Sequence, residues 1–255
     1  MRGRMAAAAS VAWISEMFVS FQGEGSRAGQ RHLFVRFAGC NIRCTWCDTP
    51  DSLVKVADCV VDYPDGEREV ISNPMPVATL ARIVARFLAE DPSIAMIAIT
   101  GGEPMVQANF LAAWLSEAPP PVGRLLETNA IVTSGLAALL PAITVVSADV
   151  KLPSNSGEGD LWDRHRAFLE ACRGTELYVK MPVDAGTDAA EVLAAAALVA
   201  ETAPGATLYL QPIADPVSNE WRIGMAALSA LAGAAATRVP DTRVLPQIHK
   251  LTGVR

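Results

Sequence analysis

The feature that most constrains the fold of this chain is a regular alternation of helix-like and strand-like segments after residue 77. Apolar side chains recur at helical spacing over residues 80–88, and a continuous apolar run follows over residues 94–99. Similar pairs recur about six times, the last strand being expected at residues 243–245. Such alternation predicts a parallel sheet with right-handed crossovers. Six units are too few for a closed eight-stranded barrel, so we expect an α/β fold, a partial (β/α)6 barrel.

Two further strands are expected before this array, at residues 13–21 and 32–37, as an N-terminal hairpin extension. The length of 255 residues suits one domain covering residues 1–255. Residues 1–12 are expected to be flexible, because their apolar run is too short for a signal peptide. Residues 52–76, which are rich in charges and turn residues, are expected to be a surface insertion.

Composition argues against several classes of function. The formal net charge of −6 disfavours a nucleic-acid partner. No apolar stretch approaches the length of a membrane span. Five cysteines, three of them close together, do not resemble a disulfide framework. We therefore expect a reducing, cytoplasmic location.

Three cysteines, Cys40, Cys44 and Cys47, have the spacing C-x3-C-x2-C in one short loop. Three thiolates on a [4Fe–4S] cluster leave one iron without a protein ligand, whereas ordinary electron-transfer clusters use four cysteines. In catalytic metal sites such an open position admits substrate or cofactor. The alternatives are buried thiols, or a zinc site completed by His32 or Cys59, although a structural zinc site usually shows a second pair of ligands.

Polar side chains recur where the expected strands end, which is where α/β barrels place their chemistry. Arg36 interrupts an apolar strand, either at an exposed edge or as a receptor for a carboxylate. Asp48 and Thr49 offer hard oxygen ligands for Mg²⁺, but their chemistry alone favours a helix cap. Gly101 and Gly102 suit either a tight turn or a close approach of backbone to a ligand. The strand-end residues that we expect to face one cavity are Cys40, Thr100, Glu127, Ser147 and Gln211.

The cysteine spacing resembles the radical S-adenosylmethionine superfamily. In that superfamily the open iron binds the methionine moiety, and an electron from the cluster releases a 5′-deoxyadenosyl radical. A more specific resemblance is to the 7-carboxy-7-deazaguanine synthases. It rests on stretches spread over the whole chain: Phe21-Gln22-Gly23-Glu24-Gly25, Val35-Arg36-Phe37-Ala38-Gly39-Cys40, Cys47-Asp48-Thr49, Thr100-Gly101-Gly102-Glu103-Pro104, Leu126-Glu127-Thr128-Asn129, and Leu245-Pro246-Gln247 with His249-Lys250.

The resemblance implies a reaction. It implies a lyase that converts 6-carboxy-5,6,7,8-tetrahydropterin to 7-carboxy-7-deazaguanine by radical ring contraction with loss of ammonia, as in queuosine biosynthesis. The implied cofactors are a [4Fe–4S] cluster, S-adenosylmethionine and Mg²⁺. The implied partners are the small-molecule pterin, a flavodoxin- or ferredoxin-type electron donor, and a second copy of the chain in a homodimer.

The resemblance also implies roles for individual residues. Cys40, Cys44 and Cys47 would hold the cluster, and Thr49 would bind Mg²⁺. The terminal carboxylate of Arg255 would close over the pterin, so extending the chain there would damage activity. The residues implied around S-adenosylmethionine are Trp46, Asp48, Gly102, Glu103, Ser147, Lys151 and Gln211. Those implied around the pterin are Gln22, Gly23, Glu24, Arg36, Thr100, Glu127, His249 and Arg255.

One departure from the family weakens two of these assignments. Many members have a compact Ser-Pro-Lys after a strand, whereas this chain has Ser147-Ala148-Asp149-Val150-Lys151. Two other functions stay open. A glycyl-radical-activating enzyme has the same cysteine spacing but a protein substrate, against which Gln22, Glu24 and Arg36 argue. A non-catalytic zinc-binding module would be colourless, whereas a cluster protein is brown.

Overall fold

The computed structural model describes residues 11–254. A ten-stranded sheet forms its centre, in the order β12-β11-β10-β9-β8-β7-β3-β2-β4-β5. The strands from β3 to β12 in this order run parallel to one another, and the sheet is open because β12 and β5 are its two edges. The parallel strands are β3 Arg31–Phe37, β7 Met96–Gly101, β8 Gly123–Thr128, β9 Val145–Asp149, β10 Glu176–Val183, β11 Thr207–Pro212 and β12 Thr242–Val244.

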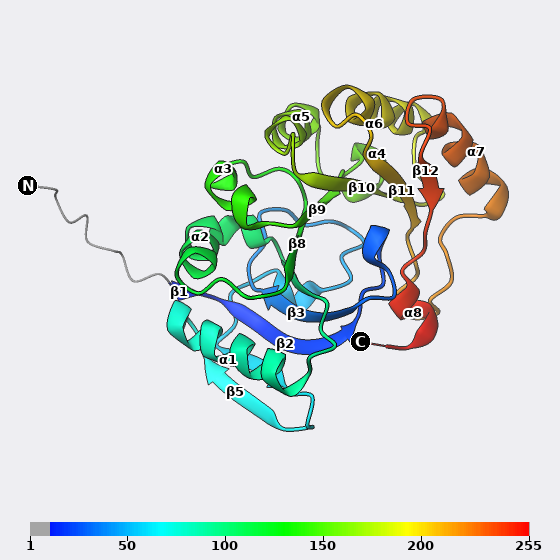
Figure 1. Cartoon of the computed structure of the whole chain (residues 1–255). Helices are drawn as coiled ribbons and strands as arrows, with labels where there is room; N and C mark the ends of the chain where they lie inside the picture. Colours follow the sequence, from blue (N-terminus) through cyan, green and yellow to red (C-terminus); the bar gives the residue numbers. More distant parts are fainter. Residues whose placement is uncertain (1–10, 255) are drawn as a thin grey trace, which may run out of the picture.

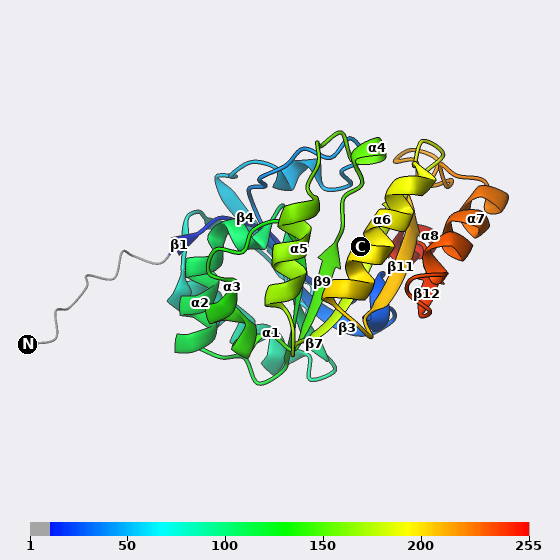
Figure 2. The same ribbon diagram turned by 90° about the horizontal axis from the view of Figure 1, so that it is seen from above.

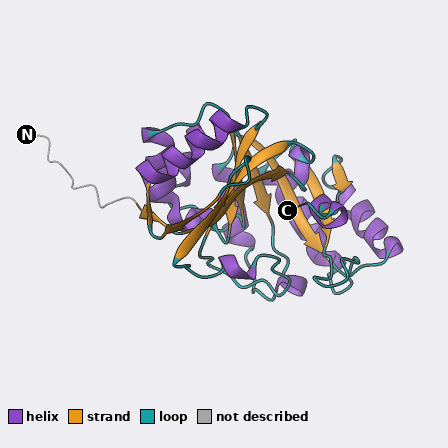
Figure 3. Cartoon of the chain, turned by 90° about the horizontal axis from the view of Figure 1, so that it is seen from below, coloured by secondary structure: helices purple, strands orange, loops and turns teal. Residues whose placement is uncertain are grey.

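Helices connect successive parallel strands and form an arc along the outer side of the sheet (Figure 1). Figure 3 shows the same arrangement, with strands inside and helices outside. Neighbouring helices α5, α6 and α7 pack against one another in sequence order (Figure 2). The connecting helices are α1 Val77–Glu90, α2 Ala108–Glu117, α3 Leu136–Leu139, α5 Trp162–Ala171, α6 Ala189–Thr202 and α7 Met225–Ala236. Two further helices are short: α4 Pro153–Ser156 lies between β9 and α5, and α8 Ile248–Thr252 follows β12. The expected α/β architecture with a partial, open barrel is confirmed.

The two faces of the parallel strands bury different sets of side chains, because successive residues of a strand point to opposite faces. On the outer face, Ile97, Val146 and Val179 belong to the large core that the helices cover. On the inner face, Leu125 and Tyr178 belong to a smaller apolar cluster. The sheet therefore has an apolar outer layer, while its inner face is left to line a cavity.

The N-terminal hairpin is formed by β2 Ile14–Phe21, which pairs antiparallel with β3. Residues 52–76 were expected to be an irregular surface insertion, but two strands in this segment extend the main sheet beyond β2. Cys59 and Val61 are fully buried in the core, which explains why the segment is ordered. These strands are β4 Asp58–Asp62 and β5 Arg68–Ser72.

A small second sheet anchors the beginning of the described chain. It pairs β1 Val11–Ala12 with β6 Met75–Pro76. Val11 and Ala12 are thus ordered, although residues 1–12 were expected to be flexible; residues 1–10 lie outside the described residues. Within residues 11–254, no helix combines the length and the apolar character that crossing a membrane requires.

Candidate functional site

A cavity of about 350 Å³ lies at the carboxyl ends of the parallel strands. This volume is within the range typical of small-molecule sites. Three segments form much of its wall: the turn after β2, the cysteine loop after β3, and the segment that joins β12 to α8. It brings together most of the residues predicted from the sequence, namely Gln22, Gly23, Glu24, Arg36, Cys40, Cys44, Trp46, Cys47, Asp48, Thr49, Thr100, Gly102, Glu127, Lys151, Gln211 and His249.

The three loop cysteines are half-buried, free thiols that line this cavity. Burial raises the pKa of the Cys44 thiol to about 11, so a cation is needed to hold it as thiolate. Tetrahedral zinc would draw its sulfur ligands to about 3.8 Å from one another. Among the described residues, Cys40, Cys44 and Cys47 do not form a group whose ligand atoms all lie within 4.8 Å of each other. Three free thiols on the wall of one cavity are the donor set that a [4Fe–4S] cluster with one open iron needs.

The glycine pair at the end of β7 packs against the backbone on both sides of the cysteine loop. A Cβ at Gly102 would lie 2.4 Å from the carbonyl oxygens of Gly39 and Ser52. A Cβ at Gly101, where φ is +121°, would lie 2.1 Å from the carbonyl oxygen of Phe37. Both positions thus require glycine. The two glycines lie close to the chain's own backbone as well as lining the cavity.

Glu103 was predicted to contact the cofactor, but it is fully buried and lies outside the cavity lining. Its Oε1 accepts hydrogen bonds from Met105 N at 2.9 Å and Thr128 Oγ1 at 2.8 Å, and its Oε2 accepts one from Asn129 N at 2.7 Å. Burial raises the pKa of Glu103 to about 7 against the opposing effect of these bonds. The carboxylate therefore ties the end of β7 to the end of β8.

At the end of β9, the structure places Asp149 rather than Ser147 in the cavity wall. Ser147, which was predicted to contact the cofactor, is fully buried and lies outside the cavity lining. Asp149 Oδ2 lies 3.0 Å from Lys151 Nζ and 3.7 Å from Lys180 Nζ. Lys151 Nζ also lies 4.5 Å from the centre of the Trp46 ring, a cation–π contact. The Nε1 of Trp46 is buried and has no hydrogen-bond partner among the described residues.

Glu24 is the most heavily hydrogen-bonded carboxylate in the cavity. Its Oε2 pairs with Lys180 Nζ, and its Oε1 accepts from Gln211 Nε2 at 3.1 Å and Gln247 Nε2 at 2.7 Å. Burial alone would raise the pKa of Glu24, but the charges of Lys180 and His249 lower it to about 2. Glu24 is therefore ionised at neutral pH.

Two other predicted residues make fixed contacts beside Glu24. Gln22 donates from Nε2 to Glu127 Oε1 at 2.8 Å and accepts from Glu24 N at 3.1 Å. Arg36 faces the cavity, while its Nε donates to Glu16 at 2.6 Å. The arginine is thus an ion-paired residue of the cavity wall on a central strand, which excludes the exposed-edge interpretation.

The segment that ends in α8 closes one side of the cavity. Ile248 N donates to Gly23 O at 3.0 Å, and a Cβ at Gly23 would lie 2.2 Å from His249 Nδ1. Gln247 Nε2 also donates to Asp48 Oδ2 at 2.8 Å. This segment therefore joins the turn after β2 to the cysteine loop.

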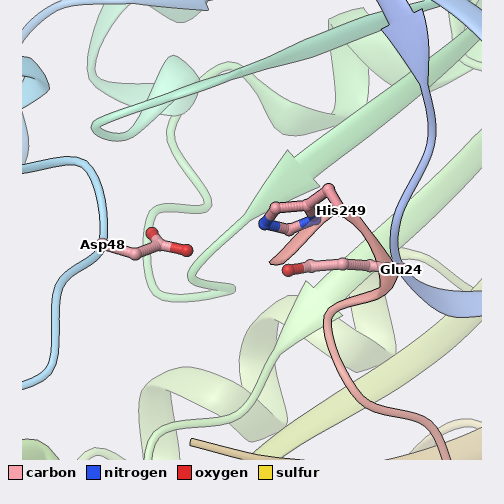
Figure 4. A group of neighbouring side chains, drawn as sticks. All are labelled: Glu24, Asp48 and His249. Atoms are coloured by element: carbon pink, nitrogen blue, oxygen red, sulfur yellow. The ribbon is translucent and has the colours of Figure 1, made fainter. Parts of the chain in front are cut away.

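Three polar side chains from these three segments converge on one point of the cavity (Figure 4). Glu24, Asp48 and His249 each place a potential metal-ligand atom within 4.8 Å of the others. Arg255, whose carboxylate was predicted to contact the pterin, lies outside the described residues.

Several residues of the cavity wall were not selected from the sequence. For Lys180 the sequence did contain an indication, because burying a lysine within an otherwise apolar strand is costly unless the lysine is paired. Gln247 and Asn129 belong to stretches that matched the family, yet nothing in those stretches indicated which side chain points inward. The polar residues missed are Thr128, Asn129, Asp149, Lys180, Gln247 and Lys250.

Comparison with known proteins shows the family of this chain. The family model described as Radical SAM superfamily matches residues 34–192. A 7-carboxy-7-deazaguanine synthase from Geobacter sulfurreducens is 32% identical over 245 residues, which cover 94% of this chain and 96% of the relative. Another from Methanopyrus kandleri is 34% identical over 248 residues, covering 93% and 92%. The chain belongs to the 7-carboxy-7-deazaguanine synthase family.

Solved structures agree on the fold. The crystal structure of QueE from Escherichia coli matches with a TM-score of 0.61 and 20% identity, covering 94% of this chain and 95% of that one. A radical SAM methyltransferase from Sphaerobacter thermophilus matches with a TM-score of 0.55 and 14% identity, covering 91% and 77%. Membership of the radical SAM superfamily implies a [4Fe–4S] cluster and S-adenosylmethionine. A cavity lined by three free cysteines, beside a buried indole N–H without a partner, fits these two groups.

Proposed function

We propose that this protein converts 6-carboxy-5,6,7,8-tetrahydropterin to 7-carboxy-7-deazaguanine with loss of ammonia, and that residues 1–255 form one catalytic domain. The names and full-length coverage of its relatives support this reaction. The observation that carries it is a single cavity in which the three-cysteine loop faces a set of hydrogen-bonding side chains. A glycyl-radical-activating enzyme would need room for a protein substrate, and a zinc module would need no such set.

One half of the cavity suits the cofactors. Cys40, Cys44 and Cys47 would hold the cluster, and S-adenosylmethionine would lie between them and the strand ends. When bound, these groups supply the electron and the radical that removes a hydrogen from the substrate. The chain itself supplies position and excludes water. The residues proposed around S-adenosylmethionine are Trp46, Asp48, Gly102, Lys151 and Gln211, with Glu103 and Ser147 acting from behind the wall.

The other half of the cavity suits the pterin. A pterin ring edge carries both hydrogen-bond donors and acceptors, and Gln22, Glu24 and Glu127 offer carboxylate and amide groups to both kinds. Arg36 has its Nε on Glu16, so its outer nitrogens can reach the substrate carboxylate. Gly23, Thr100 and His249 would complete this half, with the carboxylate of Arg255.

Mg²⁺ and two protein partners extend the proposal. Thr49 would bind Mg²⁺ together with substrate oxygens, close to the point where Glu24, Asp48 and His249 converge. A cation bridging protein and substrate would fix the orientation of a rearranging intermediate. A flavodoxin- or ferredoxin-type protein would donate the electron, and the active form would be a cytoplasmic homodimer.

The test is an anaerobic incubation of reconstituted protein with the pterin, S-adenosylmethionine, Mg²⁺ and dithionite. We expect a new ultraviolet-absorbing deazapurine from the native protein and none from Cys44→Ala. Cys172→Ala is the matched control, since Cys172 is a buried thiol outside the cavity lining. Cleavage of S-adenosylmethionine by native protein without any deazapurine would contradict the proposed substrate.

A further inference from the structure

Four charged side chains of alternating sign follow one another along the cavity wall: Glu24, Lys180, Asp149 and Lys151. Lys180 Nζ pairs with Glu24 and lies 3.7 Å from Asp149 Oδ2. Lys151 Nζ lies 3.0 Å from the same Asp149 oxygen. A single carboxylate oxygen thus lies between two ammonium groups.

The sheet register creates this arrangement. Asp149 at the end of β9 is the direct neighbour of Lys180 on β10, and Lys151 follows two residues later. The lysine side chains are only 7% and 6% exposed for Lys151 and Lys180. Two buried ammonium groups this close repel each other strongly unless an anion lies between them. Asp149 therefore supplies the negative charge between the two lysines, of which Lys180 also pairs with Glu24.

The two lysines belong to different halves of the cavity. Lys151 lies against the ring of Trp46, next to the cysteine loop. Lys180 lies against Glu24, in the turn after β2. The other oxygen of Asp149, Oδ1, is buried and has no hydrogen-bond partner among the described residues. Asp149 is thus one of the contacts through which the two halves meet.

We propose that Asp149 is a positioning residue that links the two halves, because its carboxylate holds Lys151 in the cofactor half and neutralises Lys180 in the substrate half. The proposal rests on the cofactor placement given above and not on the identity of the substrate. Its consequence is specific. Without the carboxylate, the charge of Lys180 displaces Lys151 and weakens binding of the cationic S-adenosylmethionine, although Lys180 itself lies in the other half.

The test measures the Kd of S-adenosylmethionine by equilibrium dialysis on the reconstituted holoenzyme, without reductant and without pterin. We expect Asp149→Asn to raise this Kd by about tenfold or more, since it leaves the buried Lys151 without its carboxylate partner, next to the charge of Lys180. Lys180→Met alone should change it by about threefold or less, because Asp149 still holds Lys151. The double variant Asp149→Asn with Lys180→Met should bind at least about fivefold more tightly than Asp149→Asn, because the repelling charge is gone.

The recovery of binding in the double variant separates this proposal from a merely structural role of Asp149. If Asp149→Asn only impaired folding, a second buried substitution would make the defect worse. Asp91→Asn is the matched control: Asp91 pairs with Arg31 at 2.7 Å outside the cavity lining, and its loss should leave the Kd unchanged. Native affinity in Asp149→Asn, or a double variant that binds no better, overturns the proposal. If Asp149→Asn is insoluble, the double variant must still fold and bind, and failure of both overturns it too. Failure of the pterin assay would refute only the proposed substrate.

Discussion

Gly102→Ala tests how closely the glycine pair packs against the cysteine loop. The new Cβ would lie 2.4 Å from the carbonyl oxygens of Gly39 and Ser52, about 1 Å inside ordinary contact. Neither carbonyl can turn away freely, because Gly39 O accepts from Glu103 N at 2.9 Å and Ser52 O accepts from Gly39 N at 2.8 Å. We expect the free energy of unfolding to fall by about 1–3 kcal/mol, as in overpacked cores. Since Gly39 precedes Cys40, we also expect a large loss of bound iron.

The assays are urea unfolding of the metal-free protein and iron content after anaerobic reconstitution. Gly233→Ala is the matched control, because nothing lies within 4 Å of a Cβ there and the residue is inside α7. That change should leave iron content unchanged and raise the free energy of unfolding by at most about 1 kcal/mol. If Gly102→Ala matched Gly233→Ala in both assays, the reasoning from close packing would be wrong.

Three further predictions concern charge and the closing segment. The pKa of Glu24 is lowered from 4.5 to about 2, so the stability that this carboxylate contributes is present above pH 4.5 and is lost as the pH falls towards 2. In urea unfolding, Lys180→Met should not show this loss of stability in acid. A dependence of stability on pH like that of the native protein would contradict the prediction. The pKa of Glu103 is raised to about 7, so its contribution is present below pH 4.5 and lost as the pH rises through 7. Glu103→Gln should remove this dependence of stability on pH. It should also lower the free energy of unfolding by about 1–3 kcal/mol, because the amide NH₂ of the glutamine must face one of the hydrogen-bond donors that now bind the carboxylate. A variant as stable as the native protein at every pH would refute this prediction. Gly23→Ala should raise the KM for the pterin by about tenfold and leave the Kd of S-adenosylmethionine unchanged, because the new methyl group displaces His249. Steady-state kinetics measure the KM and dialysis measures the Kd. Equal effects on both ligands would count against this prediction.

The parallel sheet was predictable because buried strands and amphipathic helices differ in period and alternate along this chain. The strands in residues 52–76 were not predicted, because charged residues flank their short apolar pairs. A signal was nevertheless present in β4, where Cys59 and Val61 alternate with more exposed neighbours. The local sequence pattern could not reveal that β4 pairs with β2, because this pairing joins segments that are far apart in the chain.

The position of the site was predictable because strand ends of a parallel sheet meet at one edge. The inward-facing side chains were harder to predict. Ser147 and Asp149 lie on the same face of β9, so periodicity could not decide between them, and only Asp149 reaches the cavity. Glu103 turns inward because one backbone N–H and one hydroxyl at the end of β8 need an acceptor. Lys180 and Glu24 are 156 positions apart, a separation at which sequence spacing carries no information.

The bonds of Gln247 have a consequence for how the protein is made. Its side chain joins Glu24 and Asp48, which are 223 and 199 positions earlier in the chain. Because a ribosome delivers the N-terminal portion first, the three thiols of the cysteine loop emerge long before the residue that completes the wall beside them. Until residue 247 has been added, a nascent chain therefore leaves these three thiols beside an unfinished wall.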